Sequence, residues 1–217
     1  MGRIKMSEEQ FLKNRQNILD AALQILVEKG LKDVSARKVA AALNMTATNI
    51  YNYYKNKDEL IFAMQNYGFK MLWDQLESSY SESLEPIDNI RGFINAYLSF
   101  AMNQPRIYSL MFGAGFEKYY KHCIGSKHFS YIFFNEEDMS LKIPNVVSRT
   151  IDKAKKNNPR ISNDNSSKLA LKLFSASHGF ITLYNNNFLN YIVPNEVEFL
   201  KENVEYLVKP FETYDTP

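Results

Sequence analysis

The sequence predicts an all-α protein with about nine helices. Apolar residues recur at intervals of three and four along most of the chain, which is the spacing of amphipathic helices. Only 8 glycines and 7 prolines occur among 217 residues, which leaves few turns for a strand-rich sandwich. Hydrophobic residues form 45% of the chain and charged residues 23%, so the composition is globular rather than disordered.

The N-terminal end contains short helices with recognisable caps. A first amphipathic helix should end at Gly30, because glycine is favoured just after a helix. Ser35, Thr46 and Asn56 can each cap the start of a further helix. Glu59 follows Asn56 by three residues, as in a capping box. These signals predict helices over residues 18–29, 35–42, 46–54 and 56–79.

The rest of the chain predicts five further helices, each marked by a cap or an apolar stripe. Pro86 and Pro105 suit the first position of a helix, and the second of these helices should end at Phe112. Asn195 can cap the last helix. Between them, apolar stripes predict helices around residues 143–154 and 169–183.

We expect two domains, residues 1–57 and residues 58–217, because the charge differs between them. The first carries ten Lys and Arg against five Asp and Glu, and the remainder carries sixteen against nineteen. A basic N-terminal end indicates an anionic partner, although a solvated basic face would give the same excess.

The sequence also predicts the compartment. Cys123 is the one cysteine, which excludes an internal disulfide and fits a reducing cytoplasm. The first ten residues lack the apolar core of a signal peptide. No stretch approaches the roughly 18 apolar residues of a membrane span. We therefore expect a cytoplasmic protein with no membrane partner.

Three short helices before a long one, with a tight turn between the second and third, predict a helix-turn-helix. Val39, Ala40 and Ile50 are apolar where the two helices must meet, and Ala40 is small where they cross. The turn needs a residue in the left-handed conformation, which Asn44 tolerates better than most side chains. The pattern therefore indicates DNA binding.

The third helix has an inward face and an outward face. Ile50 and Tyr54 lie four residues apart and should face inward, whereas Thr48 and Asn52 should face outward. In a helix-turn-helix the outward face enters the major groove. There an asparagine can pair with adenine through two hydrogen bonds, and a threonine methyl can contact thymine.

Several side chains beside this face can reach phosphates. Tyr51 and Tyr53 carry hydroxyls, Lys55 and Lys57 carry charge, and the helix after Asn56 presents backbone N–H groups. The alternative is a three-helix packing module whose tyrosines only cover its exterior.

Residues 18–60 resemble the DNA-binding domain of the tetracycline-repressor (TetR) family. The matching motifs are S.R.VA..L in the second helix and IY.YY.NK.EL across the third and fourth. The resemblance implies a homodimeric, ligand-released transcription factor, usually a repressor, on a palindromic operator in double-stranded DNA. It also implies a set of DNA contacts: Arg37, Thr46, Ala47, Thr48, Asn49, Tyr51, Asn52, Tyr53 and Lys57.

The sequence departs from the family pattern at three positions. Asn44 replaces the usual turn glycine, Thr48 stands where many members have Gly or Pro, and Tyr53 stands where His is common. In the C-terminal part, residues 96–117 and 174–184 resemble the TetR domain type named for a Trp-His-Gly motif. Ser177 takes the place of its tryptophan.

Aromatic residues and methionines concentrate in the middle helices, which predicts an apolar effector site. The resemblance places the pocket there, and these stretches hold almost no Lys or Arg, so we expect an apolar or aromatic small molecule. For any one residue, ordinary core packing remains the alternative. The candidate lining residues are Tyr97, Phe100, Met111, Phe112 and His178.

The sequence offers little support for catalysis, a metal or a cofactor. Ser177 and His178 are helix neighbours, about 100° apart, and cannot meet as nucleophile and base. His122, Cys123 and His128 could form a metal site, but two of them are adjacent in an irregular segment. We therefore expect no enzyme activity, no metal and no cofactor.

The last two helices are predicted to form a homodimer interface. Each has apolar residues beyond its own stripe, which indicates a partner surface. These are Phe174, Ile181, Tyr184, Phe188, Phe199, Val208 and Phe211. A two-fold pairing would place two reading helices about 34 Å apart, at successive major grooves.

These observations predict a ligand-responsive, sequence-specific transcriptional regulator, with the helix from Asn56 as the lever between head and body. Two alternatives remain. One is a helical small-molecule-binding protein whose helix-turn-helix binds no operator, and the other is a His-dependent or metal enzyme.

Overall fold

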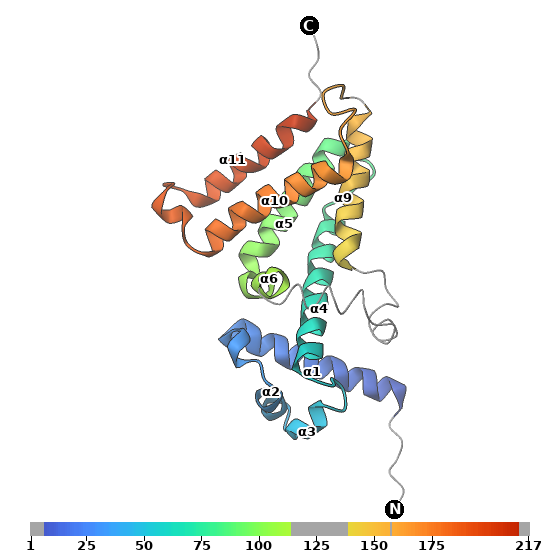
Figure 1. Cartoon of the computed structure of the whole chain (residues 1–217), viewed down its shortest axis with the longest axis vertical. Helices are drawn as coiled ribbons and strands as arrows, with labels where there is room; N and C mark the ends of the chain where they lie inside the picture. The colour runs from blue at the N-terminus through green and yellow to red at the C-terminus, as the bar shows by residue number, and fades with distance from the viewer. Residues whose placement is uncertain (1–6, 114–138, 157, 213–217) are drawn as a thin grey trace, which may run out of the picture. The chain divides into compact units, whose positions relative to one another are not determined.

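The structure is a computed structural model that describes residues 7–113, 139–156 and 158–212. Within these ranges every regular element is a helix: nine α-helices and three short 3-10 helices, with no strand (Figure 1). The predicted all-α class is confirmed. None of the described helices is long and apolar enough to cross a membrane.

The described residues divide into two compact units, which the text calls the first and the second unit. The first joins residues 7–68 to residues 106–113, and the second joins residues 69–105 to the described residues from 139 onward. Helix α4 (Lys57–Ser78) contributes to both, because the division falls after Gly68. The predicted domain boundary at residue 57 stays a prediction.

The first unit contains α1 (Glu8–Lys29), α2 (Ala36–Ala42), α3 (Ala47–Ile50), the start of α4 and most of α6 (Pro105–Phe112). The predicted caps form. The side chains of Ser35, Thr46 and Asn56 accept hydrogen bonds from Lys38, Asn49 and Glu59 backbone N–H groups at 3.3, 3.2 and 2.8 Å. Gly30 ends α1 with a φ of 89°.

The third predicted helix is shorter than expected. It was predicted to reach Tyr54, but α3 ends at Ile50 and the chain continues as a turn. The turn is held by hydrogen bonds from Asn52 N–H to Asn49 C=O and from Tyr53 N–H to Ile50 C=O. These two bonds have the 3-10 spacing, and the Tyr54 N–H also donates to the Ile50 carbonyl at 3.0 Å, so the chain makes one further turn before α4.

Helix α6 is fastened to the first unit by three contacts. The Gln65 side chain, which is buried in α4, donates to the Leu110 carbonyl at 2.9 Å. A Cβ at Gly68 would come within 2.8 Å of Met111, so only glycine permits this close packing. Arg106 is exposed. Its guanidinium donates a hydrogen bond to the Val27 carbonyl at 2.6 Å and so caps the end of α1.

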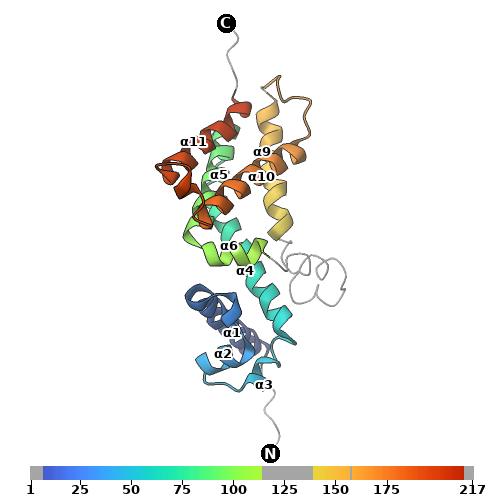
Figure 2. The same ribbon diagram turned by 60° about the vertical axis from the view of Figure 1, so that its left-hand side comes forward.

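The second unit packs α5 (Pro86–Asn103), α9 (Met139–Lys155), α10 (Ser166–Asn185) and α11 (Glu196–Val208) around the end of α4. Helices α5, α9 and α10 contact one another, and α11 lies against α5 and α10 (Figure 2). Two 3-10 turns complete the unit, at Leu189–Tyr191 and Lys209–Phe211.

The apolar stripes of α10 and α11 differ in part from the prediction. The apolar spacing after Asn195 predicts a buried stripe of Val197, Leu200, Val204 and Leu207. The Val197 side chain is 43% exposed, so that part of the prediction is wrong. The buried row is Leu200, Val204 and Val208, which lie four residues apart on one face of the helix. Three of the apolar residues expected at a dimer interface are buried within the unit instead. They are Ile181, Val208 and Phe211.

Candidate nucleic-acid interface

The α2–α3 turn has the geometry that a helix-turn-helix requires. Asn44 adopts a φ of 53°, in the left-handed region, as its position in the turn predicted. The N–H of Met45 then donates to the Ala40 carbonyl at 2.8 Å and closes the turn. Val39, Ala40 and Ile50 are buried where the two helices meet. The turn therefore fixes the direction in which α3 leaves α2.

The outward side of α3 is exposed and polar. Thr48 and Asn52 are exposed, and the Tyr51 side chain is 50% exposed. The side-chain amide of Asn52 donates to Oδ1 of Asn49 at 2.9 Å. This bond holds the Asn52 amide in one orientation, and its oxygen and second N–H can still form the two hydrogen bonds that adenine accepts and donates.

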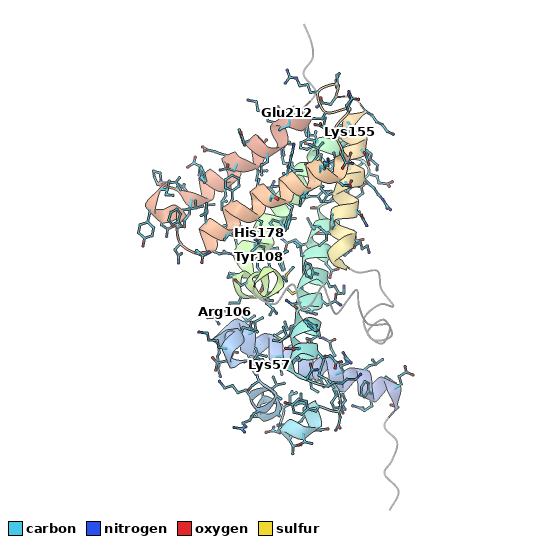
Figure 3. The ribbon with its side chains drawn as sticks, viewed as in Figure 1. Lys57, Arg106, Tyr108, Lys155, His178 and Glu212 are labelled. Atoms are coloured by element: carbon cyan, nitrogen blue, oxygen red, sulfur yellow. The ribbon has the colours of Figure 1, made fainter. Side chains whose placement is uncertain are left out.

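The structure places the other predicted DNA contacts unequally. Arg37, Thr46 and Lys57 are exposed, whereas Ala47 and Asn49 are half-buried. Of these residues, Lys57 is labelled in Figure 3. Tyr53 is only 6% exposed. Its hydroxyl accepts a hydrogen bond from the Asn14 side chain at 2.9 Å, and its ring lies 5.1 Å from that of Phe11.

Tyr53 therefore joins α1 to the end of the reading turn. This placement favours a packing role over the phosphate contact that the family resemblance implies. Spacing along the chain could not indicate this, because Tyr53 meets a side chain 39 residues away.

Exposed positive charge surrounds the reading side. Lys55 and Lys57 flank the start of α4, and Arg37 and Lys38 lie in α2. Lys38 forms an ion pair with Asp33, whose carboxyl pKa it lowers through the hydrogen bond and its charge. Part of the basic excess of the N-terminal sequence is therefore exposed on the helices that come directly before and after α3.

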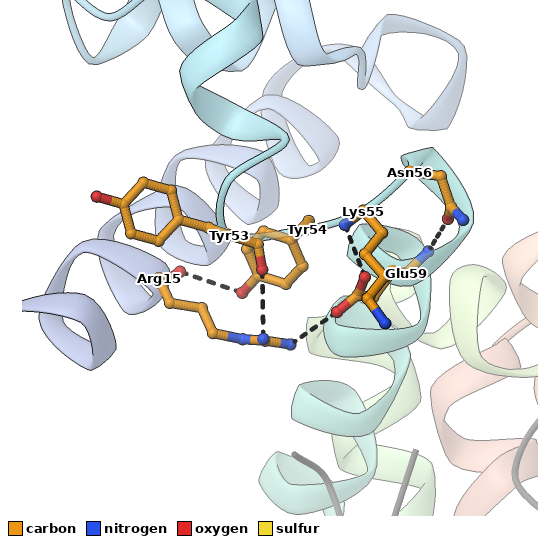
Figure 4. A network of polar contacts seen from close by, with 6 residues as sticks. All are labelled: Arg15, Tyr53, Tyr54, Lys55, Asn56 and Glu59. Atoms are coloured by element: carbon orange, nitrogen blue, oxygen red, sulfur yellow. Dashed lines mark hydrogen bonds and ion pairs between the residues drawn. The ribbon is translucent and has the colours of Figure 1, made fainter. Parts of the chain in front are cut away.

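Two functional candidates that the sequence did not single out as partners are Arg15 and Glu59 (Figure 4). The Arg15 guanidinium donates to the Tyr53 carbonyl at 3.3 Å and lies 3.4 Å from a Glu59 carboxylate oxygen. A signal was present: Arg15 lies three residues before the buried Ile18, on the face that α1 turns inward. A charge on that face needs a buried partner.

Tyr54 completes this cluster. Its hydroxyl donates to the Arg15 carbonyl at 3.1 Å, and the Arg15 guanidinium lies 4.4 Å from the centre of its ring. Burial raises the pKa of the Tyr54 hydroxyl to about 12, with the Arg15 charge opposing the rise. The prediction that Tyr54 faces inward is confirmed.

The predicted effector residues fall into two groups. In the second unit, the Tyr97 hydroxyl lies 3.2 Å from Nδ1 of His178, and the Phe174 ring packs against both. Burial lowers the pKa of the half-buried His178. Phe100 belongs to the same unit and is buried.

The other two predicted residues, Met111 and Phe112, belong to the first unit. Met111 is fully buried against Gly68, which gives it a packing role in the attachment of α6. The structure therefore brings Tyr97 and His178 together and does not group them with Met111.

The metal candidates His122, Cys123 and His128 lie outside the described residues. Within the described ranges, no group of three His, Cys, Asp or Glu side chains is arranged to hold a metal ion.

Comparison with known proteins identifies the family. Residues 18–64 match the family model of bacterial regulatory proteins of the tetR type. The N-terminal part of the chain thus belongs to the TetR family. This is a family of transcriptional regulators and not of enzymes.

Two curated relatives of this kind are HTH-type transcriptional regulators. One, from Haemophilus influenzae, is 30% identical over 94 residues, which are 43% of this chain and 50% of that protein. The other, YvkB of Bacillus subtilis, is 37% identical over 49 residues, or 23% of this chain and 26% of that protein. The chain thus spans about half the length of the first relative and about a quarter of the second.

Solved structures extend the similarity to the whole fold. A tetR-family regulatory protein from Rhodococcus RHA1 superposes with a TM-score of 0.65 at 18% identity, over 94% of this chain and 99% of that one. FadR of Thermus thermophilus, a TetR-family repressor solved with lauroyl-CoA, gives 0.61 at 14% identity, over 94% and 97%. At this identity the likeness concerns the fold alone.

Proposed function

We propose that the protein is a sequence-specific DNA-binding transcriptional regulator of the cytoplasm, a repressor that leaves a palindromic operator when a small apolar or aromatic molecule binds. The observation that carries this is the outward side of α3, where Thr48, Tyr51 and Asn52 are exposed beside exposed lysines. No packing requirement explains this group of exposed hydroxyls together with an exposed amide, that of Asn52, which is held in one orientation by Asn49.

Base reading falls to Asn52 and Thr48. Asn52 is held by Asn49 at 2.9 Å and can pair with an adenine, while the Thr48 methyl can contact a thymine. Thr48 lies in α3 and Asn52 follows its end by two residues, so both belong to the part of a helix-turn-helix that enters the major groove.

Phosphate contacts fall to the residues around them. Arg37, Thr46, Tyr51, Lys55 and Lys57 are exposed and supply charge or hydroxyl groups. Ala47 and Asn49 would approach the DNA closely without carrying charge. We assign Tyr53 to packing within the first unit, because its hydroxyl already accepts a hydrogen bond from Asn14.

A homodimer is supported by the exposed apolar residues of the last two helices. Phe174 is 41% exposed, Phe188 51% and Ile192 61%. Others on α10, the following 3-10 turn and α11 are also exposed: Leu171, Leu183, Tyr191, Val197 and Tyr206. Exposed apolar side chains in this number favour association, and a two-fold axis would repeat them on the partner.

The effector site is proposed for the second unit, beside Tyr97, Phe100 and His178. The Tyr97 hydroxyl and the His178 ring provide polar groups within an otherwise aromatic setting, which is how ligand sites fix orientation. The Thermus FadR structure contains lauroyl-CoA, a ligand with an apolar acyl chain on a polar, anionic CoA group, so only the acyl chain resembles the ligand proposed here.

Release from DNA requires that the effector bind one conformation more tightly than the other. Helix α4 is the candidate lever because it contributes residues to both units. A change in α4 at the effector site would then alter the spacing of the two reading helices of the dimer.

The proposal is tested by fluorescence anisotropy with fragments of the upstream region of the protein's own gene, titrated against salt. We expect one fragment to bind at least about a thousandfold more tightly than scrambled DNA, with affinity that falls steeply as salt rises. Equal weak binding to every fragment would contradict it and would favour the ligand-binding protein without an operator.

A further inference from the structure

We propose that Arg15 is a positioning residue for DNA recognition: it fixes the segment between the reading helix and α4 without touching DNA itself. The inference rests on the proposed function, because it concerns how the same surface is held in shape. It assigns a role to a side chain of α1, which neither the helix-turn-helix pattern nor the expected DNA contacts include.

Arg15 reaches the far side of this segment from the middle of α1. One guanidinium nitrogen donates to the Tyr53 carbonyl at 3.3 Å, and another lies 3.4 Å from the Glu59 carboxylate (Figure 4). The guanidinium also packs 4.4 Å from the centre of the Tyr54 ring. All three partners lie between the end of α3 and the first turn of α4.

Glu59 carries this constraint into the backbone. Its second carboxylate oxygen accepts a hydrogen bond from the Lys55 N–H at 2.7 Å, and its own N–H donates to Asn56 Oδ1 at 2.8 Å. In a capping box the acidic side chain returns to the N–H of the cap residue itself. Here it returns one residue earlier, so the cap extends toward the reading helix.

The segment is consequently held at three backbone points: the carbonyl of Tyr53 and the N–H groups of Lys55 and Glu59. The exposed side chains of Lys55 and Lys57 project from it, and Asn52 immediately precedes it. Holding these points fixes the distance between the base-reading side chains and the phosphate-binding ones. That distance is what a fixed DNA site must match.

Burial separates this role from a direct DNA contact. The side chains of Arg15 and Glu59 are only 11% and 6% exposed, and the guanidinium is directed at protein groups. Removing one partner of such a pair leaves the other charge buried and uncompensated. The segment should therefore change conformation when Arg15 is lost, even though no phosphate contact is lost with it.

The test compares Arg15→Met with Lys57→Ala and with a matched control, Arg91→Met. Arg91 likewise forms ion pairs, in its case with the carboxylates of Asp88 and Glu205, but it belongs to the second unit. Each variant is measured for affinity to the specific fragment, affinity to scrambled DNA, the slope of affinity against salt, and hydrogen exchange of the Lys55 amide. Arg15→Lys is measured in parallel and replaces Arg15→Met in the comparison if Arg15→Met does not fold.

We expect Arg15→Met to weaken specific binding by about tenfold or more with an unchanged salt slope, and to speed exchange at Lys55. Affinity for scrambled DNA should stay near that of the unmodified protein. Lys57→Ala should instead lower the slope by about 0.9, and Arg91→Met should change neither. Arg15→Lys should show the same pattern in weaker form, because an ammonium keeps the charge but lacks the planar fork.

Three outcomes would overturn the inference: a salt slope lowered as in Lys57→Ala, unchanged specific affinity, or equal losses of specific and scrambled binding. If the unmodified protein prefers no fragment, the proposed function fails. The exchange measurement then decides alone, since unchanged exchange at Lys55 in both Arg15 variants would show that Arg15 does not hold the segment.

Discussion

The two compact units differ in what they leave on their surfaces. Around α3 the first unit exposes amides, hydroxyls and basic groups, with Asn52 and Lys57 as examples. Along α10, α11 and the segment between them, the second unit exposes large apolar side chains, such as Phe188 and Ile192 of that segment. The first surface suits an anionic, hydrogen-bonding partner and the second suits another protein surface. This difference agrees with the two partners that we propose for one chain: DNA for the first unit and a second copy of the chain for the second unit.

The largest expected effect comes from the apolar surface. Phe188→Lys with Ile192→Lys should prevent dimer formation and weaken specific DNA binding by about a hundredfold or more, because each half-site is then bound alone. Both side chains are more than half exposed, at 51% and 61%, so the fold should survive. Sedimentation and anisotropy measure the two effects.

Leu84→Lys is the control for that pair. Leu84 is 46% exposed and lies in the segment before α5, outside the last two helices. It should leave both the dimer and DNA binding intact. A double variant that still sediments as a dimer would show that α10 and α11 do not pair.

A smaller effect is expected from the base-reading side chain. Asn52→Ala should cost about 1–3 kcal/mol of specific binding by removing a two-point contact to one base. The loss should be confined to fragments that retain that base, as competition with base-substituted fragments can measure. Unchanged selectivity would remove Asn52 from base reading.

Lys57→Ala should weaken binding to all sequences by a similar factor, about fivefold, and flatten the salt dependence. The reason is that a phosphate contact carries charge but no sequence information. Lys70→Ala is the matched control, because Lys70 is an exposed lysine paired with Asp74 farther along α4. Equal slopes for the two variants in a salt titration would contradict the phosphate role of Lys57.

The smallest effect concerns stability at high pH. Burial raises the pKa of Tyr54 to about 12, so the folded chain retains this proton at a pH where the unfolded chain releases it. Stability is therefore lost as the pH rises from about 10 to 12. Tyr54→Phe should unfold more easily at pH 8, by about 1 kcal/mol for the lost hydrogen bond to Arg15.

That variant should also lose less stability than the unmodified chain between pH 8 and 11, as urea unfolding can measure. Tyr206→Phe is the control, since Tyr206 is 72% exposed. The same pH dependence in Tyr54→Phe and in the unmodified chain would contradict the assignment.

The features that could be predicted from the sequence are mostly local. Ser35, Thr46 and Asn56 cap helices because the bond spans three residues, and Asn44 turns because of its own conformational range. The placement of Tyr53 could not be predicted this way, since its partner Asn14 lies 39 residues away. The pairing of Arg15 with Glu59 could not be predicted for the same reason, because the two residues are 44 positions apart in the sequence.

The second unit was less predictable because an apolar residue type does not specify which other residue its side chain will contact. Phe188 is exposed and Ile181 is buried, yet both are large apolar residues near the end of one helix. Which of them packs inward depends on where α5 and α9 lie, and periodicity within α10 does not contain that information. The effector residues are undetermined by sequence for the same reason.

The most direct test of two partners for one chain is a hydroxyl-radical footprint of the protein on its specific fragment, read with the stoichiometry of the complex. We predict two protected half-sites related by symmetry, about one helical turn or a whole multiple of it apart, with an even number of chains bound. One isolated protected site occupied by a single chain would contradict the account.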